Sequence, residues 1–145
     1  MKIYILCSVR NATDRQRAEL EAYTNWLEEK GHEVHLPHRD TNQQSSGLEI
    51  CMENGAAIAM SDEVHIFYDE DSMGSHFDLG MVFALDQLEG RKKRVRLVKQ
   101  PNITKPGKSF HRMIGEWIDH QNEIAYLYPN IEEATDLDFE IPFFE

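Results

Sequence analysis

Short apolar runs alternate with amphipathic helical patterns along the sequence, and this alternation constrains the fold more than any other feature. The run at residues 2–6 precedes a helical pattern that begins at Thr13 and stops at Gly31, and the same order then repeats. We predict strands at residues 2–6, 33–36, 63–68, 95–98 and 124–128, with helices at residues 48–60, 77–90 and 110–118 in the later intervals. Alternating strands and helices form right-handed βαβ units, so we expect an α/β fold with a mostly parallel five-stranded sheet and helices on both faces.

Composition and charge limit the partners of this fold. The chain has 145 residues, 41% of them hydrophobic, and a formal net charge of −11. These values predict one folded domain, residues 1–130, and an acidic tail at residues 131–145 that has no Lys or Arg. Such a charge opposes binding to a nucleic acid polymer or an anionic membrane, whereas a small anionic ligand needs only local positive potential.

Targeting signals and cysteine pairs are not evident in the sequence. No apolar run has the length of a signal-peptide core or of a membrane span. Cys7 and Cys51 lack the CxxC spacing of redox or metal sites. We therefore expect a cytoplasmic protein whose two cysteines are small buried hydrophobes.

The turn that follows the third predicted strand carries the strongest functional signal. Parallel sheets bind ligands at the carboxyl ends of their strands, and Ser72, Gly74 and Ser75 stand there at the start of a helix. Glycine allows close backbone approach, the serines offer hydroxyls, and helix N–H groups attract anions, so this turn is a candidate phosphate cradle. Asp78 would be a nucleophile, general base or sugar ligand beside it. The alternative interpretation is structural, because Ser75-x-x-Asp78 also matches a capping box.

Polar residues of the neighbouring elements belong to the same predicted edge. Ser8 and Arg10 follow the first strand, where the guanidinium could hold a phosphate or simply face water. Tyr4 lies within that strand, and its hydroxyl would reach the pocket or remain in the core. Glu53 and Asn54, on the helix before the central strand, would either point to this edge or face solvent.

Other candidate sites have weaker support. His32, His35 and His38 do not form a metal cluster in this prediction, because residues three apart on a strand point to opposite faces. We predict no metal and no cofactor, since the sequence has no HExxH, GxGxxG, Walker or GxSxG motif. The basic run at residues 91–94 is interpreted as a solvated connection that could pair with the acidic tail.

Two segments resemble a known family. Residues 4–10 (YILCSVR) and residues 72–80 (SMGSHFDLG) are similar to the nucleoside 2-deoxyribosyltransferase superfamily, especially its 2′-deoxynucleoside 5′-monophosphate N-glycosidase branch. The resemblance covers residues 1–98. It implies a flavodoxin-like, doubly wound sheet, a homodimer or larger homo-oligomer, a small nucleoside or nucleotide as substrate, and no cofactor.

The resemblance also implies residue roles. Asp78 falls where the family has its catalytic glutamate, and Tyr4 falls on the tyrosine that orients that carboxylate. Asn54 falls where the family usually has an aspartate, with Glu53 beside it. The substrate-binding positions implied are Ser8, Val9, Arg10, His38, Ser72, Gly74 and Ser75.

The function that follows is cleavage of an N-glycosidic bond, by hydrolysis or base transfer, through a carboxylate nucleophile. Two other hypotheses stay open at this stage. One is a nucleotide-binding or interaction protein on the same fold without turnover. The other is a flavin-binding module, although no Ser/Thr-rich phosphate loop follows the first strand.

Overall fold

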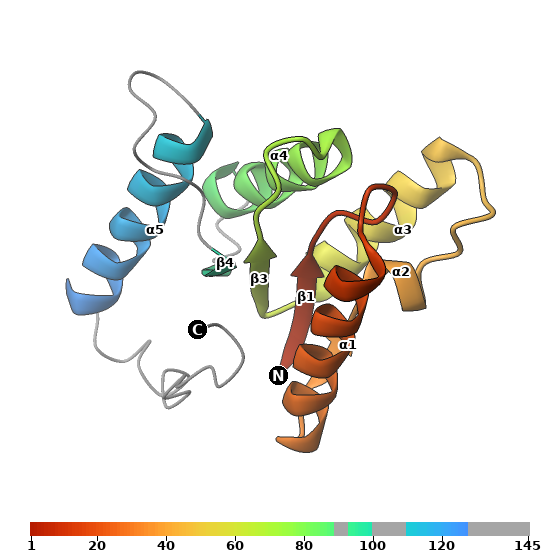
Figure 1. Cartoon of the computed structure of the whole chain (residues 1–145). Coiled ribbons are helices and arrows are strands. Elements are labelled where there is room, and N and C mark those ends of the chain that lie inside the picture. The colour runs from red at the N-terminus through yellow and green to blue at the C-terminus, as the bar shows by residue number, and fades with distance from the viewer. Residues whose placement is uncertain (89–92, 100–109, 128–145) are drawn as a thin grey trace. The chain divides into compact units, whose positions relative to one another are not determined.

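The computed structural model describes residues 1–88, 93–99 and 110–127, which form strands and helices in alternation (Figure 1). The elements are β1 (Lys2–Leu6), α1 (Asp14–Glu29), β2 (Glu33–His35), α2 (Pro37–Asp40), α3 (Gly47–Met60), β3 (Glu63–Phe67), α4 (Met73–Leu88), β4 (Arg94–Lys99) and α5 (Phe110–Leu127). The chain divides into two units, Met1–Pro101 and Asn102–Glu145, and α5 belongs to the second.

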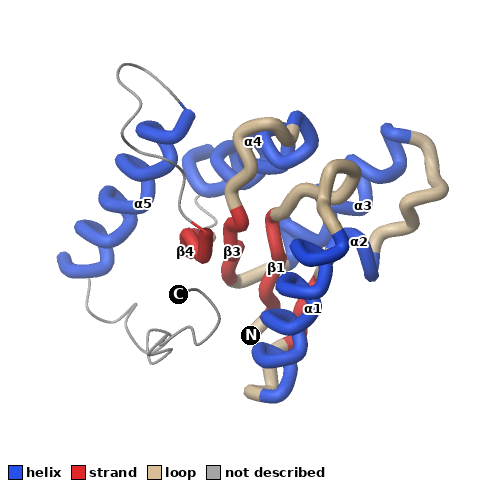
Figure 2. Tube along the Cα trace, in the orientation of Figure 1, coloured by secondary structure: helices blue, strands red, loops and turns tan. Residues whose placement is uncertain are grey.

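The sheet of the first unit is parallel throughout and has the order β2-β1-β3-β4 (Figure 2). Ile5 of β1 pairs with His65 of β3, and Lys2 of β1 pairs with Glu33 of β2. This is the strand order of flavodoxin-like folds, whose switch point lies between the first and third strands. The predicted fold class is confirmed, with four strands in the described residues.

Helices cover both faces of this sheet. On one face, Tyr23 of α1 packs edge-on against Phe67 and has its hydroxyl 2.8 Å from Nδ1 of His65. On the other face, the hydroxyl of Tyr4 donates to Asp78 of α4. Because successive strand residues point to opposite faces, β1 and β3 are buried on both sides. This burial explains the apolar run of β1, whereas the two polar residues of β3, Glu63 and His65, are buried and contact each other at 3.0 Å.

Local signals fix the helix ends. Thr13 and Gln16 form a capping box at the start of α1, and Ser46 and Glu49 form one at the start of α3. Gly31 has a φ of +87°, which glycine adopts without steric cost, so the chain turns after α1 into β2.

The fifth predicted strand is wrong. Residues 124–127 belong to α5, because no glycine or proline between residues 118 and 127 interrupts the helix that begins at Phe110. The prediction also missed α2, whose four residues are too few to show a helical period. The predicted stop at Gly90 and the boundary between domain and acidic tail at residue 130 lie outside the described residues.

The basic run before β4 is not a solvated connection where the structure describes it. Lys93 is buried, and its ammonium donates to the carbonyl oxygens of Ala59 and Ser61 at the end of α3. Arg94 forms an ion pair with the buried Glu63. A cation near a helix C-terminus offsets the partial negative charge of the last carbonyl groups, so Lys93 ties β4 to α3.

Candidate active site

A cleft of about 480 Å³ opens at the carboxyl ends of β1 and β3. Its walls are the loop after β1, the first half of α3 and the turn that leads into α4 (Figure 1). Ligands of doubly wound sheets bind at this switch point, because the loops on either side of it diverge and leave a crevice. The predicted site residues that line the cleft are Ser8, Val9, Arg10, Asn54, Ser72, Gly74, Ser75 and Asp78.

Asp78 is a buried carboxylate in the wall of this cleft, with 6% of its surface exposed. Its Oδ2 accepts hydrogen bonds from the Tyr4 hydroxyl at 2.9 Å and from the Asn54 amide at 3.3 Å. Within the described residues Oδ1 has no protein partner. Both donors therefore hold one oxygen of the carboxylate and leave the other for a ligand.

Burial dominates the electrostatics of this carboxylate. It raises the pKa of Asp78 to about 6, although the hydrogen bonds from Tyr4 and Asn54 favour the ionised form and act in the opposite direction. Burial and the neighbouring Asp78 charge also raise the pKa of the Tyr4 hydroxyl well above its usual value, so Tyr4 remains a donor. A carboxylate in this range is mostly ionised at neutral pH and only weakly solvated, as a nucleophile needs to be.

Asp78 is not a helix cap. The helix α4 begins at Met73, and its first turn is capped by Ser72, whose Oγ accepts a hydrogen bond from the Ser75 amide at 3.2 Å. Asp78 is the sixth residue of α4 and bonds to β1 and α3 instead. The capping-box interpretation of Ser75 and Asp78 is therefore wrong.

A second part of the cleft suits an anion. The guanidinium of Arg10 lies at an exposed position there, and the N-terminus of α4 supplies backbone N–H groups at Met73 and Gly74. A Cβ on Gly74 would meet no protein atom within 4 Å, so this position leaves room for a ligand. Within the part of the chain that the structure describes, the hydroxyls of Ser8 and Ser75 are buried and have no hydrogen-bond partner. A buried hydroxyl without a partner is costly, so each of the two is a candidate to bond to a ligand.

Part of the cleft lining is apolar. It is formed by Pro37 of α2, Ile50 and Cys51 of α3, and Met73 and Phe77 of α4. Burial raises the pKa of the Cys7 thiol, on the floor of the cleft, to about 12, so that thiol is unreactive at neutral pH. A planar apolar group fits against this wall.

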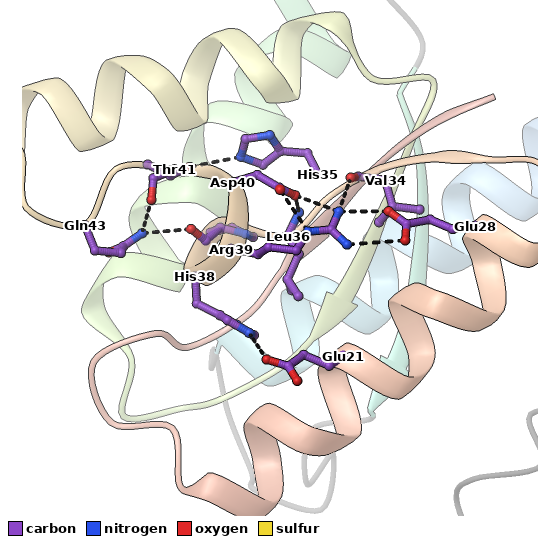
Figure 3. Close-up of polar contacts among 11 residues, drawn as sticks. Glu21, Glu28, Val34, His35, Leu36, His38, Arg39, Asp40, Thr41 and Gln43 are labelled. Atoms are coloured by element: carbon purple, nitrogen blue, oxygen red, sulfur yellow. Dashed lines mark hydrogen bonds and ion pairs between the residues drawn. The ribbon is translucent and has the colours of Figure 1, made fainter.

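Two residues predicted for this region lie elsewhere. His38 contacts Glu21 of α1 at 3.3 Å, and Glu53 is exposed and accepts a hydrogen bond from the Asn42 amide (Figure 3 shows His38). Neither lines the cleft. No group of three His, Cys, Asp or Glu side chains in the described residues is placed to hold a metal ion.

Two residues that the sequence analysis did not assign to the site, Thr41 and His35, are connected to Asn54 by hydrogen bonds on its side away from Asp78. Thr41, which is 3% exposed, donates from its hydroxyl to Asn54 Oδ1 at 2.8 Å. Nε2 of His35 lies 2.9 Å from the same hydroxyl, and the His35 ring stacks on Tyr4 at 5.4 Å between centroids. Thr41 directly follows α2, and in the sequence it is only a threonine in the polar stretch after the second predicted strand, which is too common to single out.

Comparison with known proteins finds similarity among solved structures alone. No family model and no curated protein matches the sequence. Among solved structures, the chain is similar to that of Clostridium botulinum CMP N-glycosidase, BcmB, with 18% sequence identity over 76% of this chain and 75% of that chain and a TM-score of 0.47. Within the described ranges, no helix has the length and apolar character needed to cross a bilayer.

Proposed function

We propose that this protein cleaves the N-glycosidic bond of a nucleoside 5′-monophosphate with Asp78 as the nucleophile. The observation that carries the proposal is the buried Asp78 carboxylate in the cleft wall, with Oδ2 held by Tyr4 and Asn54 and Oδ1 without a protein partner. An ionised carboxylate held this way attacks a sugar carbon without first losing a full hydration shell.

The reaction proceeds in two displacements. Oδ1 of Asp78 forms a bond to C1′ while the bond between C1′ and the base nitrogen breaks; the electron pair leaves with the nitrogen, which takes a proton from solvent. Asn54 does not supply this proton, because an amide is not an acid at neutral pH. Water then attacks C1′, and the ester bond breaks to restore the carboxylate. The water keeps one proton as the new C1′ hydroxyl and loses the other to solvent. A second base in place of water would give transfer instead.

The cleft lining offers groups that suit the phosphate and the base of a nucleotide. Arg10, the serine hydroxyls and the α4 N-terminus favour a phosphate, and the apolar wall of Ile50 and Phe77 favours a base. Asp78 lies in the same cleft as both groups, where the sugar that joins them would be placed.

A panel of nucleosides and nucleoside 5′-monophosphates, CMP included, tests this function by chromatographic detection of free base. The proposal expects base release from at least one monophosphate and faster release than from the matching nucleoside. Saturable binding of monophosphates by calorimetry without base release would contradict it and favour a nucleotide-binding protein. Binding of a flavin with a yellow absorbance band would favour the flavodoxin-like alternative.

Removing the Arg10 side chain is expected to weaken the binding of monophosphates and to leave the binding of nucleosides nearly unchanged. Arg10→Ala loses a charge-assisted, bidentate contact to the phosphate, so KM for the monophosphate should rise about 10- to 100-fold while kcat/KM for the nucleoside changes little. Arg17→Ala, an exposed arginine of α1 outside the cleft, is the matched control. Equal losses for nucleoside and monophosphate would contradict phosphate recognition by Arg10.

We further propose that the active form is a homodimer or larger homo-oligomer assembled through one apolar surface. Apart from Met1, every exposed large apolar side chain of the described residues is on α3 or α4, with exposed fractions between 42% and 87%. The six residues define the α3–α4 face: Leu48, Met52, Met60, Met73, Phe77 and Phe83. At about 200 Å² for a fully exposed side chain of this size they present roughly 800 Å², the area that one partner contributes to a stable interface.

Charge disfavours contact between two copies through the other surfaces, so a second copy is expected to bind through the apolar α3–α4 face. Neither α3 nor α4 contains a Lys or Arg, and the chain carries a net charge of −11, so two copies repel each other over most of their surface. An apolar face is self-complementary across a two-fold axis. Met73 and Phe77 belong to both this face and the cleft wall, so a partner there would border the substrate. A cytoplasmic location, where nucleotides are abundant, remains a prediction.

A charge in the α3–α4 face is expected to dissociate the oligomer. Met52→Glu should convert the wild-type species, at least twice the chain mass of 16.9 kDa, to the monomer in sedimentation or light-scattering measurements. Ala18→Glu, at an exposed position of α1, should leave the mass unchanged. A wild type that is monomeric at micromolar concentration would contradict the proposed assembly.

A further inference from the structure

Three hydrogen bonds connect β2 to Asp78 through buried side chains. The Oγ1 atom of Thr41 lies 2.9 Å from His35 Nε2 and 2.8 Å from Asn54 Oδ1, and the Asn54 amide lies 3.3 Å from Asp78 Oδ2. Figure 3 shows the contact between His35 and Thr41 beside the short helix α2. Thr41 and Asn54 are both buried, so water does not compete for these groups.

The protons of this chain can be assigned from its geometry. A hydroxyl has one proton, and the amide oxygen of Asn54 can only accept, so Thr41 donates to Asn54. The lone pair of Thr41 must then accept from His35, which requires a proton on His35 Nε2. The donors therefore run in one direction, from His35 to Thr41, to Asn54 and finally to Asp78.

This direction determines which end of the amide faces Asp78. If the Asn54 side chain turned over, its oxygen would meet the Asp78 oxygen, and only a protonated Asp78 could bond to it. Thr41 favours the orientation that presents the NH₂ group, which bonds to the ionised carboxylate. His35 also stacks on Tyr4 with an interplanar angle of 12°, so it supports both donors of Asp78.

We propose that His35 and Thr41 are positioning residues, which fix the Asn54 amide with its NH₂ group toward Asp78 and so hold the carboxylate in its nucleophilic, ionised form. The inference rests on the proposed role of Asp78. Neither residue lines the cleft, so neither touches the substrate. Their effect is transmitted through Asn54 and Tyr4.

The test is a titration of the Asp78 carboxyl by ¹³C NMR in the full chain, which needs no turnover. Thr41→Val should raise the titration midpoint of Asp78 by about half to one pH unit, because the hydrogen bond that favours the ionised form weakens. Thr41→Ser keeps the hydroxyl and should restore the wild-type midpoint. Thr24→Val is the matched control, since Thr24 is a buried hydroxyl of α1 without a hydrogen-bond partner.

A second pair of variants covers the case in which Thr41→Val does not fold. His35→Leu removes the first donor and should raise the Asp78 midpoint, whereas His35→Gln retains an N–H group and should restore it. Unchanged midpoints in Thr41→Val or His35→Leu would overturn the inference. A shifted midpoint in a protein that releases no base would instead leave the positioning intact and reject the proposed function.

Discussion

Asp78→Asn is expected to lower kcat for base release by at least about 10³-fold, because the variant has no carboxylate to form the bond to C1′. The substitution preserves shape. Its amide oxygen can still accept from Tyr4 and Asn54, so the cleft should keep its geometry and its affinity for nucleotides. Chromatographic base release and calorimetric binding on the same preparation measure the two effects separately.

The matched control for this variant is Asp86→Asn, a carboxylate eight residues further along α4 and outside the cleft lining. It should release base at the wild-type rate. Asp78→Ala guards against slow deamidation of the new asparagine, which would regenerate aspartate. Base release by Asp78→Ala at the wild-type rate would contradict a nucleophilic role of Asp78.

The same Asp78→Asn substitution is expected to stabilise the fold above pH 6. Burial raises the pKa of Asp78 from 3.8 to about 6, so between these values the folded protein binds a proton that the unfolded chain does not. The free energy of unfolding therefore falls as pH rises through this window, and the loss is complete above pH 6. A difference of two units corresponds to about 3 kcal/mol.

Thermal unfolding at pH 4.5 and at pH 8 measures this effect. The Tm of Asp78→Asn relative to wild type should increase by roughly 10 °C between the two pH values, because asparagine does not titrate. Asp86→Asn should follow the wild type at both. If the Tm of wild type and of Asp78→Asn changed with pH by the same amount, ionisation of Asp78 would not lower the free energy of unfolding, and this prediction would be wrong.

Asp78→Asn is thus expected to abolish base release and to stabilise the fold, and both effects have the same physical cause. A carboxylate that is buried enough to be a reactive nucleophile destabilises the fold, and hydrogen bonds offset only part of that cost. Tyr4 and Asn54 provide this offset, and His35 and Thr41 hold them in place. The site therefore extends one layer of residues behind the cleft wall.

Much of the fold could be predicted from the sequence because its signals are local. The apolar run of β1, the capping residue Thr13 and the stop at Gly31 each act within one element. The position of Tyr4 in the first predicted strand also allowed its hydroxyl to reach the pocket, and in the structure this hydroxyl donates a hydrogen bond to Asp78. Such features depend on neighbours in the chain, which the sequence contains.

Two of the errors depend on contacts between distant segments, and one depends on a competing local cap. The sequence around Lys93 predicts a solvated charge, because the carbonyl oxygens that its ammonium binds belong to the distant end of α3. Ser75 and Asp78 have the spacing of a capping box, but the helix begins earlier because Ser72 caps it. Thr41 reaches Asn54 across thirteen residues through the short helix α2, which no periodic pattern reveals.

The most direct test of the central claim is to trap the bond between Asp78 and the sugar. A 2′-fluoro-arabinosyl nucleotide slows the second displacement more than the first, so the ester should accumulate and be found by peptide mass spectrometry. We predict one added fluorinated sugar phosphate on the peptide that contains Asp78, with none in Asp78→Asn. Two results would contradict the account. One is release of base with the adduct on a residue other than Asp78. The other is an enzyme that the analogue inactivates but that carries no adduct.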